Sequence, residues 1–169
     1  MMATFFIADT HFSDDSIRRY ENRPFESVKE MDENIIENWN LTIGDDDTVF
    51  LVGDIGDESK LKRLKGKIIL IRGNHDRLLE EEYKKLGVSA VYDYPIVYKD
   101  FWLVSHEPMY VNRNAPYANV FGHIHSNPEY KSVSPRSFCV SVERTGYKPV
   151  SFEEIAEAVK KADEEADKA

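Results

Sequence analysis

Short apolar runs alternate with helical patterns along the chain. Runs at residues 4–8, 48–52 and 67–71 have the length of compact, buried strands. A capping box of Ser27 and Glu30 begins a helix in which apolar residues recur at helical spacing as far as Trp39. A second helix is predicted over residues 78–86, where Gly87 ends it, and an amphipathic one over 152–162.

The second half of the chain is richer in strands. Runs at 96–98 and 102–104 flank Lys99-Asp100, which predicts a hairpin, and further strands are predicted at 119–121 and 138–141. Strands that alternate with helices and then follow one another predict an α/β domain with two packed sheets. Because repeats and linkers are absent, residues 1–169 are expected to form a single domain.

A polar cluster follows each of five apolar runs. The clusters are Asp9-Thr10-His11, Gly53-Asp54, Gly73-Asn74-His75-Asp76, Ser105-His106-Glu107 and Gly122-His123-Ile124-His125. Ligands of α/β proteins gather outside the carboxyl ends of strands, so these clusters are expected to converge. All five histidines of the chain lie in them. One histidine alone is more often a surface or core residue, and Asp54 alone would be a turn residue after a strand.

The residue types in these clusters are those of a metal centre. Asp9 and His11 lie two apart on extended chain, as do His123 and His125, so each pair projects from one face. Imidazole, carboxylate and amide oxygen without thiolate suit Mn, Fe, Zn or Ni better than a structural zinc. Seven such groups exceed what one ion with open positions needs. They suffice for two ions that share a carboxylate.

The five clusters resemble the motifs of the calcineurin-like metallophosphoesterases, in their usual order, over residues 3–155. The segment 141–155 also looks like the small single-domain bacterial and phage members. The resemblance implies a four-layer α/β/β/α sandwich of two packed mixed sheets flanked by helices. It implies one metal on Asp9, His11 and His125, a second on Asn74, His106 and His123, and Asp54 bridging both. His75 would lie near the leaving group, with Asp76 orienting it or raising its basicity.

Two features depart from the family pattern. Many small members have Gly-His after the first motif, where this chain has Ser13-Asp14. This removes the histidine to which a substrate role is usually given, but it leaves the metal ligands intact. The stretch between His106 and His123 is short, so it holds no large specificity domain.

The expected activity is hydrolysis of phosphate monoesters or diesters with two divalent ions, Mn being favoured. The hypothesis is that a hydroxide bridging the metals attacks phosphorus in line, while His75 protonates the departing oxygen. An alternative is a catalytically weak, metal-binding interaction scaffold of the same fold. A scaffold would tolerate loss of ligands or of the His75 position, and here all are present.

Charge and composition limit the partners. Lys and Arg number 22 and Asp and Glu 31, a formal charge of −9, which argues against broad binding to a nucleic-acid backbone. A small phosphorylated, nucleotide-like substrate is compatible with bound cations. With one cysteine, Cys139, no disulfide can form within the chain, and no apolar run predicts a signal peptide or membrane span, so a cytoplasmic location is expected.

Several residues have two interpretations. Arg18, Arg19, Arg23 and Arg113 could grip a second phosphate or be solvated surface residues, and Tyr110 and Tyr117 could stack on a base or simply pack. Asp45-x-Asp47 matches the nucleophile motif of haloacid dehalogenases. That motif needs an apolar strand directly before it, which residues 40–44 do not supply. A turn is therefore the favoured interpretation of residues 44–47.

Overall fold

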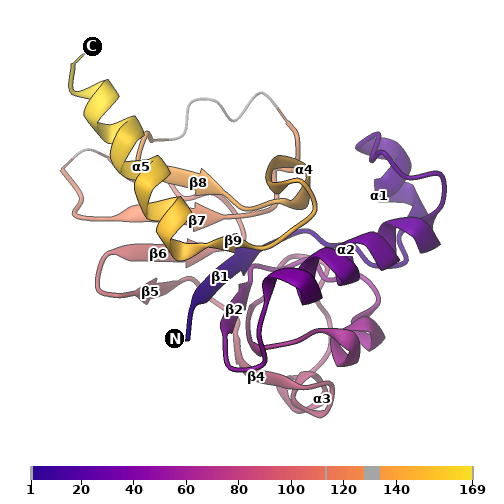
Figure 1. Cartoon of the computed structure of the whole chain (residues 1–169). Coiled ribbons are helices and arrows are strands. Elements are labelled where there is room, and N and C mark those ends of the chain that lie inside the picture. Colours follow the sequence, from indigo (N-terminus) through magenta and orange to yellow (C-terminus); the bar gives the residue numbers. More distant parts are fainter. Residues whose placement is uncertain (1, 113, 128–133, 169) are drawn as a thin grey trace.

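The computed structural model describes residues 2–112, 114–127 and 134–168, and in this part of the chain the strands form two mixed sheets (Figure 1). The strands are β1 (Thr4–Ile7), β2 (Thr48–Leu51), β3 (Lys67–Ile71), β4 (Val88–Tyr92), β5 (Ile96–Tyr98), β6 (Trp102–Ser105), β7 (Ala118–Phe121), β8 (Ser137–Cys139) and β9 (Val150–Ser151). The helices are α1 (Asp15–Tyr20), α2 (Val28–Thr42), the 3₁₀ helix η1 (Glu58–Arg63), α3 (Glu80–Lys85), α4 (Val142–Thr145) and α5 (Phe152–Ala166).

The two sheets share a design in which parallel strands end at one edge. The first has the order β4-β3-β2-β1-β9, with β1 to β4 parallel and β9 antiparallel to β1. The second has the order β5-β6-β7-β8, with β6 to β8 parallel and β5 antiparallel to β6. The β5–β6 pair is the predicted hairpin.

Alternation along β1 divides the core into two clusters. Phe6 and Ala8 face the second sheet, whereas Ile7 faces α2 on the opposite side. Between the sheets Phe6 stacks on Phe50 of β2, with ring centroids 4.9 Å apart. Trp102 of β6 is part of the same cluster. The sheets are therefore held together by aromatic and aliphatic contacts that leave their carboxyl ends free for the polar loops.

Helices flank the sheets (Figure 1). The apolar side of α2 buries Met31, Ile35 and Trp39 in the cluster that also contains Ile7. On the other side, α5 contacts β1, β8 and β9, and its buried Ile155 belongs to the cluster that contains Phe6. The predicted fold class, two packed mixed sheets flanked by helices, is confirmed. Within the described residues, no helix combines the length and the apolar character needed to cross a membrane.

Details at the element ends depart from prediction. Ser27 accepts the backbone N–H of Glu30 at 3.1 Å, but the Glu30 carboxylate accepts the N–H of Glu26, at 2.8 Å, so the capping box is only half formed. The predicted last helix extends further, to Ala166, and α1, β4, η1, α4 and β9 were not predicted. Asp47 accepts the N–H of Ala3 and of Gly44, as a turn residue does, which agrees with the favoured interpretation of residues 44–47.

The two sheets join at the edge where the polar loops begin. Ala8, directly after β1, pairs with Ser141 as an isolated parallel bridge. Its N–H donates to the carbonyl of Val140 at 2.9 Å, and its carbonyl accepts the N–H of Val142 at 3.2 Å. The ends of β1 and β8 thus lie side by side although they belong to different sheets. This junction brings loops from both sheets to one place.

Candidate metal centre

The loops that carry the candidate ligands have an unusual backbone. Ten non-glycine residues of the described chain have positive φ, and five of them are candidate ligands: Asp9 (60°), His11 (46°), Asp54 (57°), His123 (69°) and His125 (49°). This left-handed region is sparsely used by residues with a Cβ, and such strain tends to gather at functional sites. Two of the glycines that precede the clusters also allow neighbouring groups to approach closely. A Cβ on Gly53 would lie 2.5 Å from His106 Nδ1, and one on Gly122 would lie 2.5 Å from the Cβ of Ala8.

Three donor atoms from three loops meet in what we term the Asn74 cluster. The Oδ1 of Asn74 lies 3.0 Å from Nε2 of His106 and 3.0 Å from Nδ1 of His123, and the two ring nitrogens are 3.1 Å apart. The other ring nitrogen of His106 lies 2.8 Å from the carbonyl of Val52, which makes Nδ1 the donor and turns Nε2 toward the cluster. The three atoms lie close enough together to hold one cation.

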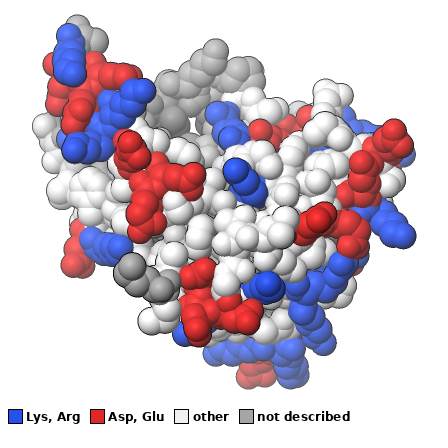
Figure 2. Space-filling view, viewed as in Figure 1, with Lys and Arg blue, Asp and Glu red and all other residues white. Residues whose placement is uncertain are grey.

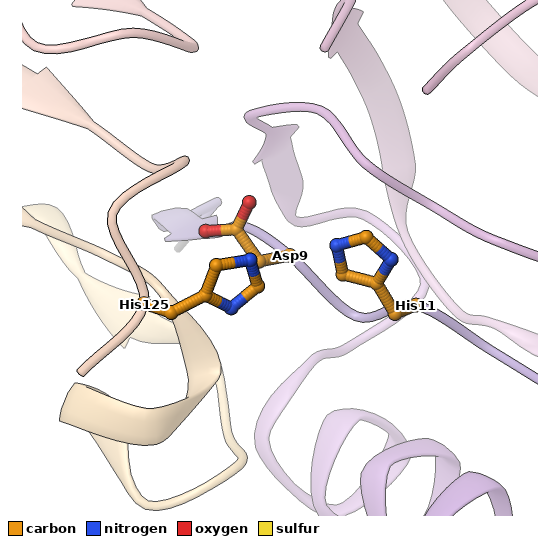
Figure 3. Close-up of side chains that lie close together, drawn as sticks. All are labelled: Asp9, His11 and His125. Atoms are coloured by element: carbon orange, nitrogen blue, oxygen red, sulfur yellow. The ribbon is translucent and has the colours of Figure 1, made fainter. Parts of the chain in front are cut away.

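A second group, the Asp9 cluster, consists of Asp9, His11 and His125, whose side chains lie close together (Figure 3). Ligand atoms of Asp9, His11 and His125 all lie within 4.8 Å of one another. The Asp9 carboxylate accepts the N–H of His123 at 2.9 Å and the hydroxyl of Ser141 at 2.5 Å. Burial raises the pKa of Asp9 to about 6, against the lowering effect of the nearby His125 and His106. A bound cation would compensate this buried negative charge.

The carboxylate of Asp54 stands between the two clusters. Its Oδ2 is 3.6 Å from Nε2 of His11 and 3.5 Å from Nε2 of His106, while its Oδ1 accepts the N–H of His75 at 2.9 Å. Burial raises the pKa of this carboxyl, but the hydrogen bond and positive charge of His106 outweigh burial and bring it to about 2. Asp54 therefore stays ionised, and its single oxygen Oδ2 faces one imidazole from each cluster.

The pKa values of the two histidines beside Asp54 are shifted in opposite directions. Burial lowers the pKa of His11 to about 4, with Asp54 acting against it, so its imidazole is neutral and keeps a lone pair. Burial also lowers the pKa of His106, but its bond to Asp54 and the charges of Asp9 and Asp54 prevail and raise it to about 9. Within the part of the chain that the structure describes, His11 Nε2 is buried and has no hydrogen-bond partner. An unpaired buried nitrogen that faces a carboxylate fits a cation between them.

The donor set as a whole fits two divalent cations. It offers imidazole nitrogens, carboxylate oxygens and one amide oxygen, and no thiolate, which suits borderline ions such as Mn, Fe, Zn or Ni. The seven predicted ligands are all brought together: Asp9, His11 and His125 in one cluster, Asn74, His106 and His123 in the other, with Asp54 between them.

His75 and Asp76 are placed very differently from each other. The His75 side chain is 63% exposed, its Nε2 lies 4.0 Å from Asp54 Oδ2, and its ring packs edge-on to that of His11. Asp76 is buried and accepts the backbone N–H groups of Gly73, Asp54 and Ile55, at 2.8 to 3.0 Å. Within the described residues no hydrogen bond or ion pair joins Asp76 to the His75 ring. Through its backbone contacts Asp76 ties the loop after β3 to the loop after β2, and its role in orienting His75 or raising its basicity stays a prediction.

The arginines for which phosphate binding and a surface position were both open have protein partners where the structure describes them. Arg18 bonds Asp15 and the carbonyl of Phe25, and Arg19 pairs with Asp15. Arg23 is neither a surface residue nor a substrate ligand, because its side chain is fully buried against Glu143 and the backbone. Arg113 lies outside the described residues. Tyr110 is exposed and Tyr117 is half-buried, so neither is committed to the core.

Sequence reasoning missed two residues that contact the clusters. Ser141 bonds Asp9, and Glu143 lies 3.0 Å from His125 Nδ1. Both follow the apolar run that forms β8, so they repeat the pattern of a strand that ends in polar residues. That pattern was the available signal, but this run ends without a histidine.

Comparison with known proteins decides the family. The family model described as calcineurin-like phosphoesterase matches residues 2–140. The chain belongs to this family. It is 35% identical to an uncharacterised protein of Methanocaldococcus jannaschii over 95% of this chain and 93% of that protein.

Solved structures agree with the fold. A protein of unknown function from Aquifex aeolicus superposes with a TM-score of 0.71 at 26% identity, over 93% of this chain and 99% of that one. A nuclease from Pseudomonas putida superposes with a TM-score of 0.51 at 21% identity, over 72% of this chain and 61% of that one. At that identity the nuclease supports the fold alone.

Proposed function

We propose that the protein hydrolyses phosphate esters with two divalent cations, one at the Asp9 cluster and one at the Asn74 cluster. The position of Asp54 carries this proposal, because its Oδ2 lies 3.6 Å from His11 Nε2 and 3.5 Å from His106 Nε2. One carboxylate shared between two ligand sets is the arrangement of two-metal hydrolases. The unpaired Nε2 of His11 supports the same interpretation.

In this proposal, the cations and the residues around them have separate roles in the reaction. Bound at these clusters, two cations would polarise the phosphoryl oxygens and lower the pKa of bound water. Asp54 accepts the backbone N–H of His75, which ties it to the loop that carries Asn74. The exposed His75 ring stands beside Asp54, where its imidazolium could donate a proton to the departing oxygen. Asp76 fixes the loop from which His75 projects.

The proposed substrate is a small phosphate monoester or diester. On the face shown in Figure 2, acidic and basic side chains are interspersed around a largely uncharged central area. A net charge of −9 also favours a small substrate over a long nucleic-acid backbone. Since Arg18 and Arg23 are committed to other partners, we propose that the cations themselves supply most of the attraction for phosphate.

An activity panel tests this function. Nitrophenyl phosphate mono- and diesters would be offered to chelator-stripped protein with Mn²⁺, Fe²⁺, Zn²⁺, Ni²⁺ or no metal. We expect turnover that requires metal and that is lost in the His11→Ala variant. An Asp163→Asn variant, changed far from the site, should retain it. Metal uptake without turnover on any ester would instead favour the interaction scaffold of the same fold.

A further inference from the structure

The carboxylate of Glu143 lies directly behind a candidate metal ligand. Its Oε1 is 3.0 Å from Nδ1 of His125, and the Glu143 side chain is 4% exposed. A carboxylate at Nδ1 makes that nitrogen the donor and leaves Nε2, with its lone pair, to face the Asp9 cluster. Metal-binding histidines commonly receive their tautomer and orientation from such a partner. Glu143 is well placed to do this for His125.

Arg23 connects the same carboxylate to the other half of the cluster. Its Nε and Nη2 donate to Oε1 of Glu143 at 2.9 and 2.7 Å. Its Nη2 also donates to the carbonyl of Asp9 and its Nη1 to that of Thr10, at 2.7 and 2.9 Å. The guanidinium is fully buried. One buried ion pair therefore links the loop that carries Asp9 and His11 to the loop that carries His125.

A third cation beside Glu143 fits this geometry poorly. Ligand atoms of Glu21, His125 and Glu143 do lie within 4.8 Å of one another. However, the Arg23 guanidinium already contacts Oε1 of Glu143, and Glu21 accepts the Ser126 hydroxyl at 2.6 Å. A second positive charge at this place would be repelled by Arg23 at close range. Glu143 is therefore better explained as a partner of His125 than as a ligand.

We propose that Glu143, held by Arg23, is a positioning residue for His125 and so sets the affinity of the Asp9 cluster for its cation. The inference rests on the proposed two-metal function and extends it to residues beyond the matched range 2–140. It also gives the segment after β8 a role, since Ser141 of the same segment bonds Asp9 at 2.5 Å. Loss of such outer partners typically weakens metal binding about 10–100-fold.

The test compares Mn²⁺ binding by the wild type and three variants of the full chain. Glu143→Gln keeps the side chain's size and removes its charge. Glu143→Asp keeps a charge for Arg23 but withdraws the carboxylate from His125. The aspartate variant alone carries the test if the glutamine variant does not fold. Asp163→Asn is the matched control, because it breaks a partly buried arginine–carboxylate pair, with Arg136, remote from the clusters. Chelator-stripped protein is titrated with Mn²⁺, and free and exchange-coupled Mn²⁺ are followed by electron paramagnetic resonance.

We expect the Glu143 variants to weaken Mn²⁺ binding at only one of the two sites. In the Glu143 variants one of two dissociation constants should rise about 10–100-fold while the other stays within about twofold, and the coupled signal should need excess Mn²⁺. Asp163→Asn should match the wild type. Unchanged constants in both Glu143 variants, or equal weakening of both sites, would overturn the inference and leave Glu143 a merely structural residue. If the wild type itself takes up no Mn²⁺, that result contradicts the proposed two-metal function, on which the role of Glu143 depends.

Discussion

Substituting Asp54 by asparagine removes a negative charge from the point where the two clusters meet. The amide oxygen can still accept the N–H of His75, which Asp54 Oδ1 accepts at 2.9 Å. At the Oδ2 position, however, an NH₂ group would face His11 Nε2 and His106 Nε2, which lie 3.6 and 3.5 Å away. The loop should therefore keep its shape while both cation sites lose the oxygen that they share.

The cost to the chelator-stripped protein follows from the pKa of Asp54. That pKa falls from 3.8 to about 2, which corresponds to roughly 2 kcal/mol. Because the folded-state pKa is the lower one, this stability is present above pH 3.8 and is lost as the pH falls through about 2. An amide cannot supply it at pH 7. The variant should unfold at a temperature lower by roughly 4–8 °C, given about 2–4 °C per kcal/mol at this chain length.

The Asp54→Asn substitution should cost more free energy in turnover than in stability, because it weakens the binding of both ions. We expect a loss on the order of 10³-fold at saturating Mn²⁺, from several kcal/mol of lost charge stabilisation. His123→Ala, which removes a ligand of the Asn74 cluster alone, should lose less. Initial rates on a nitrophenyl ester and thermal unfolding with chelator are the two assays. Near-normal turnover of Asp54→Asn at saturating metal would refute the shared-ligand reasoning and return Asp54 to a turn residue.

Two further predictions concern individual histidines. His75→Ala should keep both metals but lose about 10²–10⁴-fold on alkyl esters and far less on nitrophenyl esters, which need little leaving-group protonation, whereas His106→Ala should lower metal content and both rates. Equal losses for His75→Ala would rule out the general-acid role. Without metal, the raised pKa of His106, about 9, gives stability that is full below pH 6.5 and is lost as the pH rises through 9. Urea unfolding with chelator should show a decline of up to about 3 kcal/mol over that range, absent in His106→Gln.

The sequence was most informative where polar residues follow apolar runs. The strand ends at Asp9, Asp54 and His106 were recognisable because parallel strands end at one edge, and the seven predicted ligands do converge there. Strand β3 has its predicted bounds for the same reason: an apolar run closed by Gly73 and polar residues. Periodicity was equally reliable for α2, where burial of Trp39 follows from its helical spacing.

Other features depend on contacts that no local pattern encodes. From the sequence, Arg23 could be a surface residue. In the structure it is buried and bonds Glu143, which lies 120 residues later in the chain. Asp76 adjoins His75 in sequence, but the tight turn sends its carboxylate to the N–H groups of Asp54 and Ile55 instead. Strand β9 has two residues, Val150 and Ser151, and exists because the edge of β1 is available to pair with it. Each outcome is decided by tertiary packing.

The central claim is that two ions share Asp54, and metal stoichiometry tests it most directly. Protein stripped with chelator, reconstituted with excess Mn²⁺ and freed of unbound metal should contain close to two Mn per chain by elemental analysis. It should also give an exchange-coupled resonance that Asp54→Asn lacks. Folded wild-type protein that retains one ion or none, or two ions that show no coupling, would contradict a shared two-metal centre.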